Sequence, residues 1–286
     1  KTPANAEGYT DMYYICLETM KEDEQLAVEY LKILSGLIES RIPVAGEELR
    51  DLFLLHKRVL LAAAPYDFES YLLYVEWEGD KKFYAPRRKV MRPVVEAMQG
   101  LIDDELDLLT ISMPPGTGKS TLGIFFLSWV MGKYPDSQSL ASAHSGMLTR
   151  SFYDGVYQII TDCEYLWKDV FPGVAMAATN SKEETIDLNK RHRFSTLTCR
   201  AINASLTGAT RCDKILYADD LCSGIEEAMS KERLDKLWTT YTNDLKSRKK
   251  EGAKEIHIAT RWSVHDVIGR LEDMYGASDR ARFIVL

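Results

Sequence analysis

The fold class of this chain is decided by the stretch LLTISMPPGTGKST at residues 108–121. Its apolar beginning, Leu108–Ser112, predicts a short buried strand, and the glycines and prolines that follow predict a loop. From about Lys119 to Gly132 the residues are apolar nearly all round, which predicts a buried helix. A strand, a glycine-rich loop and a helix in this order are the setting in which a phosphate-binding loop occurs.

The residue types of this loop suit phosphate binding. Gly116 and Gly118 let the backbone curl so that its N–H groups converge on the β- and γ-phosphates of a nucleotide. The start of the helix adds a partial positive charge, and Lys119 adds a full one. The hydroxyl of Ser120 would bind Mg²⁺. The residues predicted to bind ATP are Pro115, Gly116, Thr117, Gly118, Lys119, Ser120 and Thr121.

A pair of carboxylates follows another apolar run, in the sequence ILYADD at residues 215–220. Ligands of open α/β sheets bind at the carboxyl ends of the strands, which is where this pair would lie. We expect Asp219 to hold Mg²⁺ through water and Asp220 to orient and polarise the attacking water. Asp220 stands where Glu is usual. Because its side chain is one methylene shorter, the attacking water must lie closer to the strand, or the strand must lie closer to the nucleotide. Two carboxylates in an ordinary strand-end turn are the alternative.

A third polar strand end completes the predicted site. The predicted strand 255–260 ends in Thr260, followed by Arg261 and Trp262. A polar residue at the tip of a strand beside the acidic one can reach the γ-phosphate, so Thr260 is predicted to sense hydrolysis. Arg261 has two open interpretations, a contact with phosphate or nucleic acid and a structural salt bridge.

Strands and helices alternate along the rest of the chain, which predicts an α/β fold with a mostly parallel sheet flanked by helices. Further strands are expected at 139–143, 184–188, 195–202, 214–218 and 282–286, and further helices at 148–163, 225–246 and 264–275.

Residues 1–80 differ from the remainder in pattern and charge. They carry 7 Lys and Arg against 16 Asp and Glu, a net charge of −9 within a chain of net charge −7. Apolar spacing of three and four predicts a helix or helix pair at 12–38 and another helix at 48–63. We therefore predict an acidic helical segment, 1–80, and a P-loop domain, 81–286, with the boundary at the turn Glu78-Gly79-Asp80.

The cysteines and the hydropathy exclude several classes. The five cysteines are scattered and contain no C-x-x-C pair, which fits neither a disulfide framework nor a zinc site. No apolar run approaches the roughly 18 residues that a membrane span needs, and the N-terminus has no signal-peptide core. A reducing cytoplasm is the expected compartment.

Three segments together resemble the large terminase subunit of tailed phages. They are PPGTGKS at 114–120, SLTGATRCDKILYADD at 205–220 and IATRWSVHDVIGRL at 258–271. The last is the most distinctive, since in that family a Thr-Arg-aromatic followed by Asp and Gly-Arg-Leu forms a coupling strand and its helix. The resemblance covers about 82–286, and residues 1–80 would be a lineage-specific helical addition.

The resemblance implies an ASCE-type, RecA-like ATPase that couples Mg-ATP hydrolysis to the translocation of double-stranded DNA into a procapsid. The partners it implies are phage DNA, the portal protein, the small terminase subunit and copies of the chain in a ring, usually a pentamer, with no membrane. It would act in the host bacterial cytoplasm, transiently on the portal, and would be absent from the mature virion. The nuclease domain that normally follows is expected to lie outside these residues.

The resemblance also suggests an arginine finger. The Gly-x-x-Arg that ends in Arg211 resembles the terminase stretch that faces the next subunit, so Arg211 is expected to act in trans. Arg150 and Arg200 are weaker candidates for the arginine finger. Arg150 begins a helix, where the helix dipole disfavours its charge, and Arg200 falls inside a strand. The alternative is a surface arginine that bonds its own Asp213 or Asp219.

Three features depart from the patterns. Met113 stands where the phosphate-loop pattern has Gly, and Pro115 stands where many terminases have Arg. The sequence shows no upstream Gln motif for adenine. Tyr84 or Arg88 could pack on the base instead, the alternative being a solvated basic turn.

Other P-loop enzymes are the rival interpretation. A helicase would need a second RecA-like domain, and an AAA+ enzyme would end in a helical lid where this sequence predicts a strand. A nucleotide-gated scaffold without hydrolysis is a third possibility, against which the water-orienting Asp220 argues.

Overall fold

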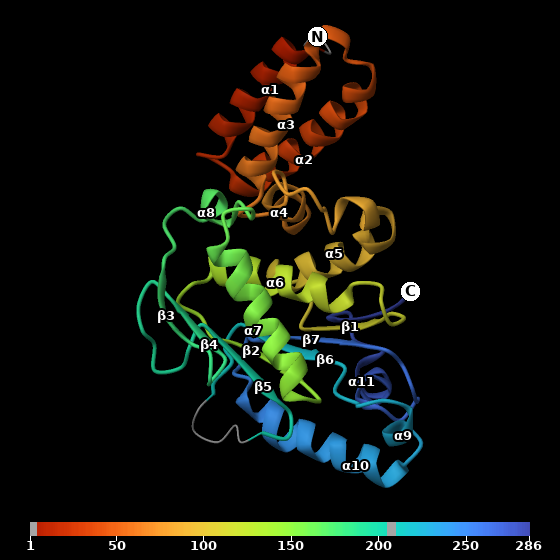
Figure 1. The fold of residues 1–286 in the computed structure, drawn as a ribbon. Helices are drawn as coiled ribbons and strands as arrows, with labels where there is room; N and C mark the ends of the chain where they lie inside the picture. The colour runs from red at the N-terminus through yellow and green to blue at the C-terminus, as the bar shows by residue number, and fades with distance from the viewer. Residues whose placement is uncertain (1–4, 205–209) are drawn as a thin grey trace. The chain divides into compact units, whose positions relative to one another are not determined.

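A computed structural model describes residues 5–204 and 210–286 of the chain (Figure 1). The chain divides into two compact units. Of the described residues, 5–89 with 162–172 form the helical unit, and 90–161 with 173–204 and 210–286 form the sheet unit. The segment after Asp80 belongs with the helical unit because Tyr84 Oη donates to Glu69, and Arg88 binds both Glu69 and Glu39.

The helical unit is built on three helices that pack along one another, with two short helices beside them. Its elements are α1 (Ala6–Thr19), α2 (Glu24–Arg41), α3 (Leu49–Ala63), α4 (Phe68–Val75) and α8 (Trp167–Val170), with 3-10 turns at Ile42–Val44, Gly46–Glu48 and Ala85–Arg87. The apolar stretch predicted at 12–38 is thus a helix pair. Asp23 separates the two helices, because its side chain caps α2 by accepting the N–H of Leu26.

Among the described residues, the sheet unit has eight strands in the order β3-β4-β5-β2-β6-β7-β1-β8. They are β1 (Leu108–Ser112), β2 (Ser139–Ala143), β3 (Met176–Asn180), β4 (Thr185–Leu188), β5 (Leu197–Ala201), β6 (Ile215–Asp219), β7 (Lys254–Ala259) and β8 (Ala281–Val285). The six strands from β5 to β8 in this order are parallel, and β4 is antiparallel to both β3 and β5. The predicted α/β fold with a mostly parallel sheet is confirmed.

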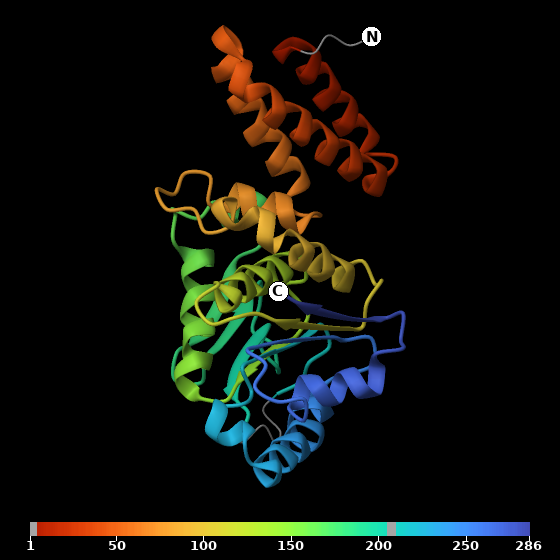
Figure 2. The same ribbon diagram turned by 90° about the vertical axis from the view of Figure 1, so that its right-hand side faces the viewer.

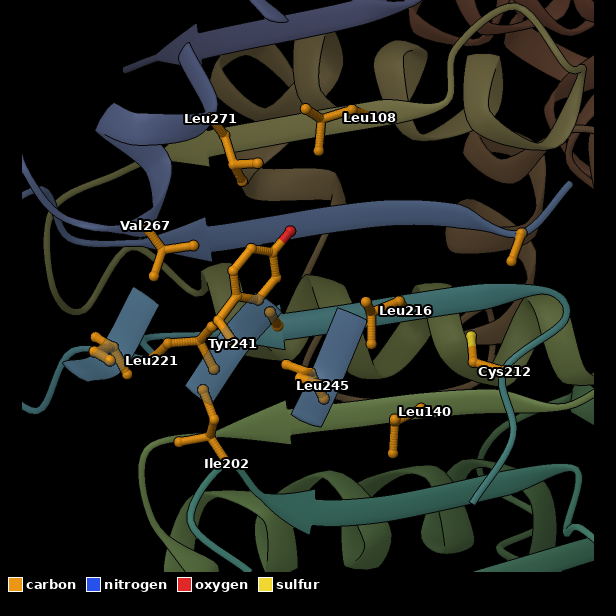
Figure 3. Close-up of a cluster of buried hydrophobic side chains, with 13 residues drawn as sticks. Leu108, Leu140, Ile202, Cys212, Leu216, Leu221, Tyr241, Leu245, Val267 and Leu271 are labelled. Atoms are coloured by element: carbon orange, nitrogen blue, oxygen red, sulfur yellow. The ribbon is translucent and has the colours of Figure 1, made fainter. Parts of the chain in front are cut away.

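Helices flank this sheet on both faces. The unit holds most of α5 (Arg88–Ile102), together with α6 (Lys119–Lys133), α7 (Gly146–Thr161), α9 (Ile225–Ala228), α10 (Lys231–Thr240) and α11 (Val267–Tyr275). In both views α6 lies above the sheet and α10 below it (Figures 1 and 2). Leu216 of β6 packs in one buried cluster with Leu271 of α11 (Figure 3). Ala218 of β6 and Leu237 of α10 belong to the same cluster. Alternation along β6 turns Tyr217 toward α6 and α7.

A very close contact joins α6 to β6. A Cβ added to Gly123 of α6 would lie 1.8 Å from the hydroxyl oxygen of Tyr217. Tyr217 is fully buried, and its ring also packs at 5.2 Å on the ring of Phe152 of α7. Only glycine at position 123 lets α6 approach β6 this closely, so this contact fixes the helix relative to the acidic strand.

The prediction of a single helix at 225–246 is wrong, because the structure has separate helical segments over this range. The short helix α9 ends at Ala228, and Ser230 then caps the start of α10 by accepting the N–H of Arg233. After α10 the chain widens into a π-helical turn, Tyr241–Leu245, and then a 3-10 turn, Lys246–Arg248. The Tyr241 hydroxyl donates to the buried carboxylate of Glu255 on β7.

Candidate functional site

The predicted phosphate loop connects β1 to α6 at the carboxyl edge of the sheet. Gly116 and Gly118 have φ values of 76° and 93°, in the left-handed region that glycine adopts without strain. Gly118 directly precedes the first residue of α6, Lys119. Met113, which replaces a glycine of the pattern, is buried, and its N–H donates to the carbonyl of Ala259 on β7. The methionine therefore extends the β1–β7 pairing by one residue.

The amine of Lys119 lies among the other predicted residues. It donates to the hydroxyl of Thr260 at 2.8 Å and lies 3.3 Å from the carboxylate of Asp220. Only 7% of Lys119 is exposed. These contacts bring together the tips of β7 and β6 and the start of α6, as the sequence predicted.

Asp219 is the most perturbed group of the site. It is fully buried, and its Oδ2 accepts the Ser120 hydroxyl at 2.6 Å. Within residues 5–204 and 210–286, its Oδ1 finds no hydrogen-bond partner. Burial raises the pKa of this carboxyl to about 7, helped by the charge of Asp220 and opposed by the Ser120 hydrogen bond and the Lys119 charge. A buried oxygen without a donor is costly, so this atom suits a ligand that supplies positive charge.

Mg²⁺ fits this pair of residues. It prefers oxygen ligands, and it usually keeps waters and binds one or two carboxylates together with substrate phosphates. The Ser120 hydroxyl and the Asp219 carboxylate supply such oxygens. In the described part of the chain, no group of three or more His, Cys, Asp and Glu side chains could hold a metal ion.

Asp220 is held in an unusual backbone conformation. Its φ is +41°, a value that costs a residue with a side chain about 1–3 kcal/mol and persists only where the surroundings enforce it. Its N–H donates to the Ile258 carbonyl at 2.8 Å, and its Oδ1 accepts the Thr260 N–H at 2.8 Å. Its carbonyl lies 2.7 Å from Nδ1 of His144, which follows β2. The sequence did not single out His144.

Arg211 does not join this cluster. It precedes β6, whereas Asp219 is the last residue of that strand. Arg211 and the acidic pair therefore lie toward opposite ends of β6, whose five residues span about 13 Å. Its side chain is 44% exposed, and its Nε lies 4.0 Å from Asp213. Gly208 and the rest of 205–209 lie outside the described residues.

The two competing arginines have other partners. Arg150 binds Asp154 at 2.9 Å, and Arg200 binds Glu183. Arg261 lies 3.0 Å from Glu272 of α11 and 3.6 Å from Asp266, which caps the same helix. For Arg261 the structure therefore shows the salt bridge that the sequence left as one of two interpretations.

The two residues considered for adenine are engaged within the helical unit. Tyr84 is fully buried, and its hydroxyl donates to Glu69 at 2.8 Å. Arg88 donates to the same Glu69 at 2.7 Å and to Glu39 at 2.8 Å. These residues therefore do not lie in a solvated basic turn. Both side chains have partners within the helical unit, and contact with a nucleotide base would have to replace those contacts.

The five residues of the cluster offer a defined chemistry. Lys119, Thr260 and the glycine loop present donors, Ser120 and Asp219 present metal-binding oxygens, and Asp220 presents a second carboxylate on a rigid backbone. All of them lie at the carboxyl ends of β1, β7 and β6, which are adjacent and parallel. That edge is where ligands of parallel α/β sheets bind.

The sequence matches no protein-family model, and a comparison with curated proteins found no match. None of the helices in the described residues is both long and apolar enough to cross a membrane.

Proposed function

We propose that this chain is a P-loop ATPase, and specifically the motor domain of a viral terminase that couples Mg-ATP hydrolysis to translocation of double-stranded DNA into a procapsid. The observation that supports an ATPase is the convergence of Lys119, Ser120, Asp219, Asp220 and Thr260 beside a loop whose glycines have left-handed backbones. The terminase assignment rests on the three sequence segments that resemble that family.

Phosphate binding would fall to the loop and to Lys119. The first N–H groups of α6 have no partner within the helix and carry its positive dipole end, which attracts the phosphates. Lys119 adds a full charge, and its position is fixed by Thr260 and Asp220. Mg²⁺ held by Ser120 and Asp219 would neutralise charge on the β- and γ-phosphates.

Hydrolysis would depend on Asp220. A γ-phosphate that binds Lys119 competes with the Asp220 carboxylate for the amine, now 3.3 Å away. Losing that partner leaves one Asp220 oxygen able to accept a proton from the attacking water. The other oxygen stays on the Thr260 N–H, so the carboxylate keeps its orientation. Thr260 would thus report on the phosphate through Lys119 and on the water through Asp220.

The proposed biology extends to several partners. The motor would act as a ring of identical chains, usually five, on the portal protein, with phage DNA and the small terminase subunit, in the host bacterial cytoplasm. Arg211 would complete the site of the neighbouring subunit. Its exposure and its distance from the acidic pair of its own chain suit a role in trans.

Steady-state phosphate release tests the ATPase. We expect Mg²⁺-dependent hydrolysis that is slow without an assembled ring. Lys119→Ala should abolish tight nucleotide binding, whereas Asp220→Asn should bind nucleotide and lose about 10²–10⁴-fold in turnover. The matched control is Lys236→Ala, which removes an exposed lysine of α10. A wild-type chain that binds ATP and releases no phosphate would favour the scaffold interpretation, and DNA unwinding would favour a helicase.

A further inference from the structure

His144 occupies a fixed position beside the acidic pair. It directly follows Ala143, the last residue of β2, which pairs with Asp219 on one side and with Ala201 of β5 on the other. The Ala143 carbonyl also accepts the N–H of Ile202 at 2.9 Å. The backbone is therefore held on both sides just before His144, and the β2–β6 register sets His144 next to Asp220.

The contact of His144 defines its hydrogen bonding. Its Nδ1 lies 2.7 Å from the carbonyl oxygen of Asp220. A carbonyl oxygen can only accept, so Nδ1 must carry the proton and donate it. In the neutral ring Nε2 then has the lone pair, and a protonated ring would keep the same donation. The contact is therefore maintained whether or not the imidazole is charged.

This donation acts on the peptide group that leaves Asp220. The other contacts of Asp220, with Ile258, Thr260 and Lys119, come from β7 and from the start of α6. His144 supplies the contact from the β2 side, and it holds the carbonyl rather than the carboxylate. A backbone at φ +41° persists only where its surroundings over-determine it. Without His144, the peptide after Asp220 is free to turn toward an extended conformation.

We propose that His144 is a positioning residue for the proposed ATP hydrolysis. It keeps the Asp220 backbone in the left-handed conformation, which directs the carboxylate to the attacking water. This inference rests on the proposed function. Lys119, Ser120 and the loop glycines have no part in the contact, so nucleotide binding should not depend on it. The expected signature is a loss of turnover without a loss of binding.

Three substitutions separate this role from others. His144→Ala removes the donor and should lower kcat by about 10–100-fold, the range for displacing a catalytic group by up to about 1 Å. His144→Asn places an amide N–H close to the position of Nδ1 and should restore most of kcat. His144→Gln carries its N–H further out, near the position of Nε2, and should not restore it.

A second histidine provides the matched control. His192, after β4, also contacts a backbone carbonyl, with Nε2 3.3 Å from the oxygen of Leu188. His192→Ala removes a comparable contact remote from the acidic pair. We expect His192→Ala to leave kcat and KM at the wild-type values. A change in this variant would show the general effect of losing a contact between a histidine and a backbone carbonyl.

The experiment measures kcat, KM and the dissociation constant of a fluorescent ATP analogue for the full chain and these variants. We expect kcat to fall in His144→Ala and His144→Gln, to recover in His144→Asn, and the dissociation constant to stay within about twofold. An unchanged kcat in His144→Ala overturns the inference. So does an Asn variant as slow as the Ala variant, or a parallel loss of binding. If the Ala variant does not fold, the contrast between Asn and Gln decides. A wild-type chain that hydrolyses no ATP instead overturns the proposed function, and this inference with it.

Discussion

Replacing Asp219 with Asn should change how the stability of the protein depends on pH. The carboxyl of Asp219 is buried, and its pKa is raised from 3.8 to about 7. The native state therefore keeps a proton that the unfolded chain releases at lower pH. The contribution of this group to stability is full below about pH 4 and is lost as the pH rises toward 7. Asn does not titrate, so the variant should lack this loss.

The size of the effect follows from the shift in pKa. Each pKa unit corresponds to about 1.4 kcal/mol, and the shift of Asp219 is about 3 units, or about 4 kcal/mol in total. Between pH 5 and pH 8 the wild type should lose about 3 kcal/mol relative to Asp219→Asn. A constant difference between the two proteins is also expected, because the Asn amide replaces an oxygen that has no donor in the described structure. Only the change with pH reports the titration.

Urea unfolding at several pH values measures this difference. The free energy of unfolding of Asp219→Asn minus that of the wild type should rise steadily from pH 5 to about pH 7 and then level off. Asp273→Asn, which removes a carboxyl from the exposed face of α11, is the matched control. If the difference for Asp219→Asn is flat across this range, Asp219 is ionised throughout and the reasoning from its burial is refuted.

Three further outcomes are expected. Gly123→Ala should lower the free energy of unfolding by about 1–3 kcal/mol or more, since its Cβ would overlap the Tyr217 hydroxyl; equal urea midpoints would contradict this. Tyr241→Phe should cost about 1–3 kcal/mol by removing a donor to the buried Glu255, and an unchanged thermal midpoint would contradict it. Arg211→Ala subunits and subunits lacking the phosphate-loop lysine should each be inactive, yet regain part of the ATPase activity when mixed on portals. A mixture that stays inactive beside active wild-type rings would contradict action in trans.

The buried strands were predictable from local sequence. β1 and β2 have the expected bounds, because both are short runs of apolar and small residues that lie between turn residues, as strands covered on both faces do. The edge strand β3 was missed because its residues, MAATN, are partly or fully exposed and lack an apolar run. Helix α5 was missed although Met91, Val94 and Met98 recur at helical spacing. Pro93 and the basic residues before it obscured that pattern.

The residues of the candidate site were predicted where the sequence shows the end of a strand. The sequence indicated Lys119, Asp219 and Thr260 because each lies at the end or start of a clear element. His144 could not be found in this way, because its role depends on β2 lying beside β6. Strand order comes from packing between segments distant in the chain, which a single sequence does not display. The break before α10 is different, because Ser230 caps that helix through a contact with Arg233 only three residues away, a local signal that the sequence analysis missed.

The neighbours of β1 have a consequence for how the protein is made. β1 carries the phosphate loop, yet its two partners are β7 and β8, the last two strands of the sheet in chain order. During synthesis, this fully buried apolar strand leaves the ribosome long before either partner exists. Contacts between distant segments form slowly, and unpaired apolar strands aggregate. Until β7 and β8 have been synthesised, β1 therefore has no strand to pair with on either side.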